Sequence, residues 1–275
     1  MNNGIYWQDK NDRAQIAVEH TNYMDLLYKD QINESIKNTK VHGPGNLYLD
    51  INTALKESNI NTAIYVCNAF TCDVFSQKYD SDIELGLEPN SNTAILNFAS
   101  YKNPGGMFLK GSSAQEEYLC HHSFLYNVLS TFNEYYEWNC KNLHKALYTN
   151  RALYSPNIYF IVNGIVYNAD VITCAAPNKS AAIKYKMVTE QENSNALDSR
   201  IKFVLDVAVY NNVDNLVLGA YGCGVFGQDA NEVASIFKKY LLTTHKNLFK
   251  RVIFAVPSMH NDYNLSSFIK VFSDI

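Results

Sequence analysis

The chain has 275 residues, of which 47% are hydrophobic and 18% are charged, and its formal net charge is −4. This apolar content is normal for a packed globular protein and excludes a disordered or collagen-like chain, while no apolar run reaches the ~18 residues of a membrane-spanning helix. The mild negative charge predicts no basic face for nucleic-acid backbones, and so no direct reading of bases.

The N-terminal region, residues 1–60, lacks a clear strand pattern and contains two weak helical patterns, at 12–27 and 31–37. We interpret it as a helical extension packed on one globular domain, residues 61–275. The first twenty residues are polar and contain no apolar stretch of the kind that secretory signals carry, so a cytoplasmic location without membrane partners is expected. The six cysteines form no C-x-x-C pair, which favours reduced thiols over disulfides or structural zinc.

Strand and helix patterns alternate in the main domain. Buried strands are predicted at 62–67, 93–99, 157–162, 170–175, 215–220 and 251–256. Helices are predicted at 115–132, 196–210, 229–242 and 265–272, with Asp229 as the N-cap of the third. This alternation predicts an α/β fold in which a mixed sheet lies between helices.

Glycine is scarce in this chain and is concentrated in two windows. Seven of the 12 glycines are Gly105, Gly106 and Gly111 in the first window and Gly219, Gly222, Gly224 and Gly227 in the second. Each window connects a predicted strand to a predicted helix. Such connections lie at the carboxyl ends of strands, where α/β proteins bind ligands.

The second window matches the dinucleotide fingerprint G-x-G-x-x-G at residues 222–227. That fingerprint normally opens the first βαβ unit, whereas this one begins the last quarter of the chain. The following strand, 251–256, also offers no acid for a ribose. A nicotinamide-dependent oxidoreductase is therefore disfavoured, although a glycine loop at a helix N-terminus can still bind a diphosphate.

Both windows resemble one family, the bacterial-type poly(ADP-ribose) glycohydrolases, which are a branch of the macrodomain superfamily. Its signature is a glycine triplet, six to eight residues and then Gln-Glu-Glu, similar here to residues 105–107 and 115–117. Residues 97–104 resemble the family's lead-in strand, and residues 216–227 resemble its diphosphate loop. The resemblance runs from about 94 to 256. It implies a macrodomain-like sheet and a glycosidase that releases ADP-ribose from poly(ADP-ribose) by hydrolysing ribose–ribose O-glycosidic bonds.

The resemblance also implies roles for individual residues. Glu117 would be the general acid/base, with Glu116 and Gln115 orienting the loop and bonding ribose hydroxyls. Asn103 would contact the distal ribose, and the ring of Phe226 would press on it. The implied binding residues are Asn103, Gly105, Gly106, Gln115, Gly222, Cys223, Gly224, Val225 and Phe226. No metal or cofactor is implied, and Tyr263 is a candidate partner for the adenine.

Several alternatives remain open from the residues themselves. Met107 stands where the family has its third glycine, so the protein could bind ADP-ribose without turnover. A hydrolase of mono-ADP-ribosylated protein or nucleic acid is a second alternative. On spacing alone, Glu116 and Glu117 are ordinary acids in the first turn of a helix. Glu117 and His121 have a spacing that can hold a metal, but no third ligand is evident, and Cys223 has no identifiable histidine partner that would make it a nucleophile.

Overall fold

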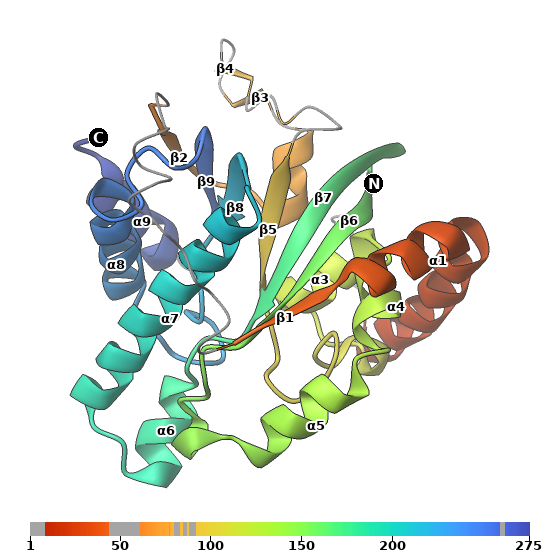
Figure 1. Cartoon of the computed structure of the whole chain (residues 1–275), viewed down its shortest axis with the longest axis horizontal. Coiled ribbons are helices and arrows are strands. Elements are labelled where there is room, and N and C mark those ends of the chain that lie inside the picture. The colour runs from red at the N-terminus through yellow and green to blue at the C-terminus, as the bar shows by residue number, and fades with distance from the viewer. Residues whose placement is uncertain are drawn as a thin grey trace.

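The computed structural model describes residues 9–43, 61–76, 78–79, 83–84, 87, 92–258 and 262–275. Figure 1 shows a twisted central sheet with helices on both of its faces. In the described residues the sheet has seven strands in the order β1-β6-β7-β5-β8-β9-β2. They are β1 (Lys40–His42), β2 (Ala63–Cys67), β5 (Thr93–Phe98), β6 (Ala152–Val162), β7 (Ile165–Cys174), β8 (Asn215–Leu218) and β9 (Arg251–Ala255). A separate pair, β3 (Lys78–Tyr79) and β4 (Ile83–Glu84), is antiparallel.

The sheet is mixed, as the sequence predicts. Strands β7, β5, β8, β9 and β2 run parallel to one another, whereas β6 is antiparallel to both β7 and β1. Parallel strands place their carboxyl ends at one edge of the sheet. The loops that follow β5 and β8 therefore leave from the same edge.

Successive residues of the central strands face opposite sides of the sheet. Ile95, Val217 and Ile253 pack into one core with α1 (Lys10–Asn38), α3 (Gln115–His122), α4 (Leu125–Leu129) and α5 (Asn133–Lys141). Leu96, Leu216 and Val252 pack into the other with α7 (Glu190–Tyr210), α8 (Ala230–Leu242) and α9 (Tyr263–Phe272). Because both faces are buried, these strands are continuously apolar in sequence.

The single helix predicted over 115–132 is wrong, because the structure breaks it into α3 and α4. Ser123 lies between them in an extended conformation, with φ −151° and ψ 175°. It forms an isolated bridge to Phe160 of β6, and its hydroxyl accepts the Leu125 N–H at 3.1 Å. The break is thus made by contact with the sheet rather than by a local helix breaker.

The N-terminal region contributes a strand that the sequence analysis missed. Helix α1 spans both weak helical patterns, with non-helical backbone at Tyr28, and β1 follows it directly. Lys40 of β1 pairs with Tyr154 of β6, so this part of the region extends the main sheet. The remaining residues of the predicted extension, 1–8 and 44–60, lie outside the described part of the chain.

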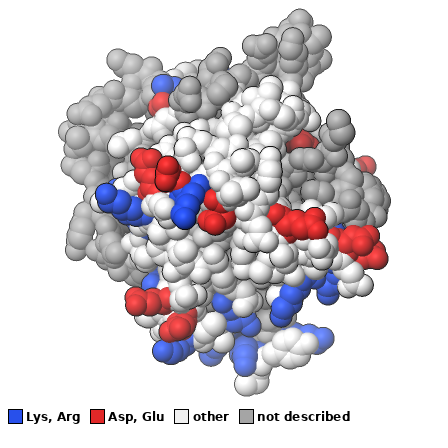
Figure 2. Space-filling view, turned by 90° about the vertical axis from the view of Figure 1, so that its right-hand side faces the viewer, with Lys and Arg blue, Asp and Glu red and all other residues white. Residues whose placement is uncertain are grey.

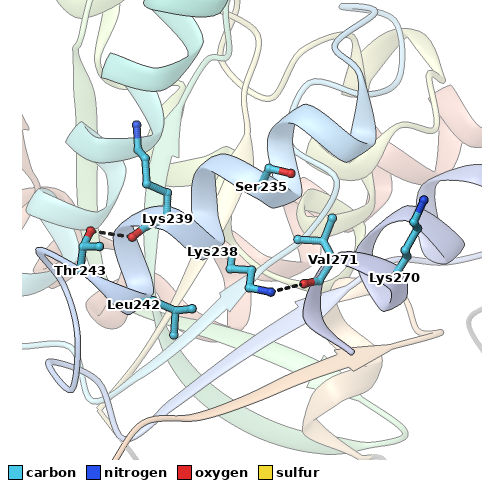
Figure 3. Close-up of a pocket in the computed structure, with 7 residues that line it drawn as sticks. All are labelled: Ser235, Lys238, Lys239, Leu242, Thr243, Lys270 and Val271. Atoms are coloured by element: carbon cyan, nitrogen blue, oxygen red, sulfur yellow. Dashed lines mark hydrogen bonds between the residues drawn. The ribbon is translucent and has the colours of Figure 1, made fainter. Parts of the chain in front are cut away.

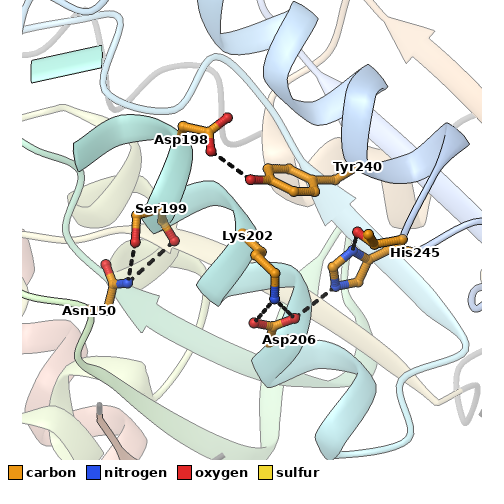
Figure 4. Close-up of polar contacts among 8 residues, drawn as sticks. Asn150, Asp198, Ser199, Lys202, Asp206, Tyr240 and His245 are labelled. Carbon is orange, nitrogen blue, oxygen red and sulfur yellow. Dashed lines mark hydrogen bonds and ion pairs between the residues drawn. The ribbon is translucent and has the colours of Figure 1, made fainter. Parts of the chain in front are cut away.

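Polar contacts join α7 to α8 and to the turn after it. Asp206 of α7 accepts from Lys202 at 2.8 Å and lies 3.0 Å from the ring of His245. The hydroxyl of Tyr240 donates to Asp198 at 2.6 Å (Figure 4). The remaining elements of the described residues are short: α6 (Lys179–Lys186) and the 3₁₀ turns η2 (Thr71–Phe75), η3 (Phe108–Lys110) and η4 (His144–Ala146).

The surface has no single sign of charge on the face shown in Figure 2, where acidic and basic groups are interspersed and several basic groups gather at the lower edge. A pocket of about 560 Å³ lies between α8 and α9, lined by Ser235, Lys238, Lys239, Leu242, Thr243, Lys270 and Val271 (Figure 3). None of the predicted site residues lines it, and Lys238 is held there by the Val271 carbonyl at 2.7 Å. Among the described helices, none combines the length and the apolar character needed to cross a bilayer.

Candidate active site

The two glycine windows follow β5 and β8, which are neighbouring parallel strands. The ring of Phe98, at the end of β5, lies 5.6 Å from the ring of Tyr221 in the second window. A Cβ atom on Gly219 would lie only 3.0 Å from Phe98 Cζ. Residues more than 100 positions apart in sequence thus form one surface at the carboxyl edge of the sheet.

The first window closes over two carboxylates. Gly105 and Gly106 have φ values of +63° and +62°, which disfavour any residue with a Cβ atom. A Cβ atom on Gly106 would lie 2.5 Å from Glu117 Oε1 and 3.0 Å from Glu116 Oε2. The loop therefore needs glycine here to approach the acidic pair.

Glu117 is the third residue of α3 and is 5% exposed. Its Oε2 accepts the N–H of Ala114, the N-cap residue, at 3.0 Å. Its Oε1 accepts the N–H of Met107 at 2.9 Å. The carboxylate is consequently held in one orientation between the helix start and the glycine loop.

Glu116 lies beneath the lead-in of the same loop. Its Oε2 accepts the Ser100 N–H at 2.6 Å and its Oε1 accepts from Asn97 Nδ2 at 3.1 Å. Burial, with a contribution from the adjacent Glu117, raises the pKa of Glu116 to about 8. Since the side chain is only 3% exposed, Glu116 is a buried group that ties the lead-in to α3. Asn97 and Ser100 were not singled out from the sequence, although they belong to the lead-in segment.

Gln115 fastens α3 to the end of β5. Its Oε1 accepts the Phe98 N–H at 2.8 Å. Its Nε2 donates to the Leu96 carbonyl at 2.9 Å and to Thr71 Oγ1 at 3.2 Å. The protein itself uses the oxygen and the nitrogen of this amide, so the structure places Gln115 as a support for the loop.

The second window presents backbone donors without acceptors. Within the described residues, four N–H groups donate to no protein atom: those of Gly222, Gly224, Val225 and Phe226. The turn is closed by its other amides, since Gly227 N donates to the Gly224 carbonyl at 2.9 Å and Gln228 N to the Gly222 carbonyl at 3.0 Å. Neutral donors of this kind suit an anion such as a diphosphate.

Cys223 contributes differently from its neighbours. Its N–H donates to the Ala220 carbonyl at 3.1 Å, so it closes the turn. Burial raises the pKa of its thiol to about 12. A thiol with such a pKa is almost entirely protonated near neutral pH, which argues against a nucleophile.

Three further predicted residues lie around these loops. Asn103 is exposed, and its carbonyl accepts the Gly106 N–H at 3.1 Å. Met107 is 40% exposed and has a φ of −113°, so the missing third glycine causes no backbone strain. Tyr263 donates to the N-cap residue Asp229 at 2.7 Å, which places it beside the second loop.

Aromatic rings connect the two windows. Phe226 is partly buried, and its ring centroid lies 6.2 Å from that of Tyr148. Tyr148 in turn stacks on Tyr101 of the lead-in to the first window, with centroids 4.1 Å apart and planes 13° apart. Neither tyrosine was identified from the sequence, where 20 tyrosines give no means of choosing between them.

No group of three or more metal-ligating side chains occurs among the residues that the structure describes. The ring of His121 packs at 4.6 Å against Phe108, and burial lowers the pKa of His121 to about 3. Its two ring nitrogens have no hydrogen-bond partner in the described structure, so the side chain behaves as a neutral core group.

Comparison with known families decides the assignment. Residues 10–163 match the family described as microbial-type PARG, catalytic domain, where PARG denotes poly(ADP-ribose) glycohydrolase. The match covers more than half of the chain. This chain belongs to the microbial-type PARG family.

Solved PARG structures agree with this assignment. The enzyme from Deinococcus radiodurans in complex with ADP-ribose is 31% identical, with 89% of this chain and 98% of that chain covered and a TM-score of 0.78. The enzyme from Thermomonospora curvata is 27% identical, with coverages of 95% and 100% and a TM-score of 0.80. The same Thermomonospora curvata enzyme bound to the inhibitor ADP-HPD has a TM-score of 0.79 and is 28% identical, with coverages of 95% and 100%. A comparison with curated proteins finds no match.

The family, fold class and glycosidase class predicted from the two glycine windows are thereby confirmed for this PARG. The roles of individual site residues stay predictions.

Proposed function

We propose that this chain hydrolyses ribose–ribose O-glycosidic bonds of poly(ADP-ribose), with Glu117 as the general acid/base. One observation carries the assignment of that residue. Glu117 is a buried carboxylate held by two backbone N–H groups, and the loop after the neighbouring strand offers four amides that have no acceptor among the described residues. A sugar diphosphate bound by those amides would bring its terminal ribose toward this carboxylate.

The reaction needs one proton to be given and one to be taken. Cleavage of the anomeric C–O bond passes through an oxocarbenium-like transition state. Glu117 in its acid form donates a proton to the departing ribose oxygen, and the resulting carboxylate then takes a proton from the attacking water. The products are ADP-ribose and a polymer shortened at that bond, and Glu117 returns to its acid form.

Glu116 acts as a positioning residue in this proposal. Because its pKa is raised to about 8, it stays largely neutral at pH 7 and does not repel a charged Glu117. Its bonds to Ser100 and Asn97 hold the lead-in of the first loop. Gln115 supports the same segment from β5, and Asn103 is left to contact the distal ribose.

Phe226 and the amides around it form the proposed diphosphate and ribose surface. Gly222, Gly224, Val225 and Phe226 supply the N–H donors, and Gly105 and Gly106 let the first loop approach the sugar. The neighbouring PARG from Deinococcus radiodurans is described in complex with ADP-ribose, which supports ADP-ribose as the product here. The cytoplasmic location stays a prediction from the N-terminal composition.

Release of ADP-ribose from purified polymer tests the proposal. Glu117→Gln should lower turnover at least about 1,000-fold, because it removes proton transfer, while the dissociation constant for ADP-ribose stays within about threefold. Glu190→Gln is the matched control, since Glu190 is also a first-turn glutamate but lies on α7 in an exposed ion pair with Lys179.

Three outcomes would contradict the proposal. Tight ADP-ribose binding without release from any substrate would make the protein a binding module, and unchanged turnover in Glu117→Gln would remove that residue from the chemistry. Release from mono-ADP-ribosylated protein or nucleic acid, but not from polymer, would shift the substrate class.

A further inference from the structure

The turn between α5 and β6 has an unusual backbone. His144, Lys145, Ala146 and Tyr148 have φ values of 44°, 55°, 68° and 61°. Residues with a Cβ atom avoid this left-handed region, and a run of them is rare. The other left-handed residues that are not glycine, in the described part of the chain, are four asparagines and Met187. A conformation of this kind persists only where the surroundings impose it.

A buried arginine supplies that constraint. Arg200 of α7 is 2% exposed, and no carboxylate pairs with it among the described residues. Its Nε donates to Asn150 Oδ1 at 2.8 Å and its Nη2 to the Leu147 carbonyl at 3.2 Å. Its Nη1 donates to the Ala175 carbonyl at the end of β7. The guanidinium is thus used to hold the backbone of this turn against the sheet.

A second contact fixes the same turn to α7. Asn150 points toward Ser199 and donates to its hydroxyl at 2.8 Å (Figure 4). On the opposite side, the Asn178 N–H donates to the Ala146 carbonyl at 2.9 Å. The turn is therefore anchored before and after Tyr148.

The anchored turn places the Tyr148 ring between the two windows. Tyr148 stacks on Tyr101 at 4.1 Å, and the hydroxyl of Tyr101 lies 2.9 Å from Thr149 Oγ1. On its other side Tyr148 meets Phe226 at 6.2 Å. Among the described residues, Tyr148 is the aromatic ring that contacts Phe226, so it limits how far the Phe226 ring can turn.

We infer that Arg200 and Tyr148 are positioning residues that set the Phe226 platform for the distal ribose. Arg200 imposes the left-handed turn, the turn presents Tyr148, and Tyr148 holds Phe226 in the second loop. The ligand in this inference comes from the proposed function. The positioning of Phe226 by Arg200 and Tyr148 does not depend on that ligand.

Hydrogen–deuterium exchange of the unliganded full chain tests the structural part. The Gly227 and Gln228 amides are hydrogen-bonded within the second loop, so peptides that cover residues 222–228 report on it. Arg200→Lys should raise exchange in both 143–150 and 222–228, since a single ammonium cannot reproduce the three-way fork. Lys202→Met is the control on the same helix, because Lys202 faces Asp206, and it should leave both segments unchanged.

Tyr148→Ala is a second variant that tests the inference even if Arg200→Lys does not fold. It removes the ring and leaves the arginine contacts, and it should raise exchange in 222–228. Tyr148→Phe retains the ring and loses only the hydroxyl's contact with Asn178, so its rate should lie much closer to wild type than that of Tyr148→Ala. Unchanged exchange at 222–228 in Tyr148→Ala would overturn the inference.

Calorimetry with ADP-ribose tests the functional part. Tyr148→Ala should weaken binding about tenfold in the wild-type background and less than about twofold when Phe226→Ala is already present, because both changes act on one platform. Fully additive effects would overturn the proposed route through Phe226. A wild-type protein that fails to bind ADP-ribose would instead refute the proposed function, and the exchange experiment would still decide the positioning role.

Discussion

Two separate constraints exclude a Cβ atom at Gly106. Its φ of +62° disfavours a Cβ atom, and that atom would lie 2.5 Å from Glu117 Oε1. Gly164 has a similar φ of +78° with no atom within 4 Å of the added Cβ. An alanine at position 164 would therefore strain the backbone alone, whereas an alanine at position 106 would also displace the Glu117 carboxylate.

Gly106→Ala should lower turnover at least about 100-fold, because it moves the group that transfers the proton. Both Gly106→Ala and Gly164→Ala should lose about 1 kcal/mol of unfolding free energy through strain, but Gly164→Ala should retain activity. Steady-state kinetics and urea unfolding on the pair provide the measurement. Equal activity losses would mean that the collision with Glu117 has no catalytic consequence.

Glu116 makes the free energy of unfolding depend on pH between about 4.5 and 8. Its pKa is raised from 4.5 to about 8 in the folded state, so folding favours the protonated form. The stabilisation is full below pH ~4.5 and is lost as pH rises through 8, by up to about 1.4 kcal/mol per pH unit.

Glu116→Gln should flatten the slope between pH 5 and 8. Urea unfolding of both proteins between pH 5 and 9 tests it. A wild-type slope that persists in the variant would assign the titration to another group.

At the scale of elements, α3 depends on its first residue for attachment to the sheet. Gln115 makes three hydrogen bonds, to Phe98, Leu96 and Thr71. Gln115→Ala leaves a buried strand N–H and carbonyl without these partners, which should cost about 2–3 kcal/mol of unfolding free energy.

The same variant distinguishes support from ligand contact. If Gln115 supports the loop, the midpoint of thermal unfolding falls and turnover decreases while the ADP-ribose dissociation constant changes little. A weaker affinity without loss of stability would show that Gln115 binds ribose hydroxyls directly. Calorimetry and thermal unfolding together decide between the two.

The contact between η3 and α3 predicts sensitivity to acid. Burial lowers the pKa of His121 from 6.5 to about 3, so the folded state favours the neutral ring. Its contribution is complete above pH ~6.5 and is lost as pH falls toward 3. His121→Phe keeps a ring beside Phe108 and should shift the acid-unfolding midpoint, followed by circular dichroism, to lower pH. A midpoint unchanged or raised by the substitution would contradict this origin.

The sequence patterns identified those elements whose own residues mark them, by continuous apolar character or by a cap. The strands β5, β8 and β9 are continuously apolar because helices cover both faces, and Asp229 marks the start of α8 as an N-cap. By contrast, β1 has three residues and pairs with Tyr154 far along the chain. The break at Ser123 likewise depends on Phe160 of another element.

The residues of the candidate site likewise fall into those that the sequence identifies and those that only the fold reveals. The glycine windows and the acidic pair are contiguous motifs, so the sequence exposes them. Arg200 acts on a residue 50 positions away, and Tyr148 has no local feature that distinguishes it from other tyrosines. Partners that meet only through the fold cannot be found from spacing in a single sequence.

For the whole molecule, the proposed anion site is made of neutral donors. The chain carries a net charge of −4, and the second loop contributes backbone amides in place of lysine or arginine side chains. Ligands held by cationic side chains lose affinity steeply with salt, whereas amide-bound ligands release few counterions.

The dissociation constant for ADP-ribose should therefore change less than about threefold between 50 and 500 mM salt. Calorimetric titrations with ADP-ribose across that range measure it. The same titrations with a single-stranded oligonucleotide of equal charge provide the comparison. A steep salt dependence would indicate that unidentified cationic side chains hold the diphosphate.

The pairing of β5 with β8 also has a consequence for biosynthesis. Thr93 and Asn215 meet in the sheet although 122 positions separate them. At a ribosomal speed of roughly 10 residues per second, the acidic pair emerges about ten seconds before the second window. On the proposed assignment, a nascent chain at that stage carries the reactive carboxyl without the loop that would bind a diphosphate beside it, so activity cannot begin before the second window has been synthesised.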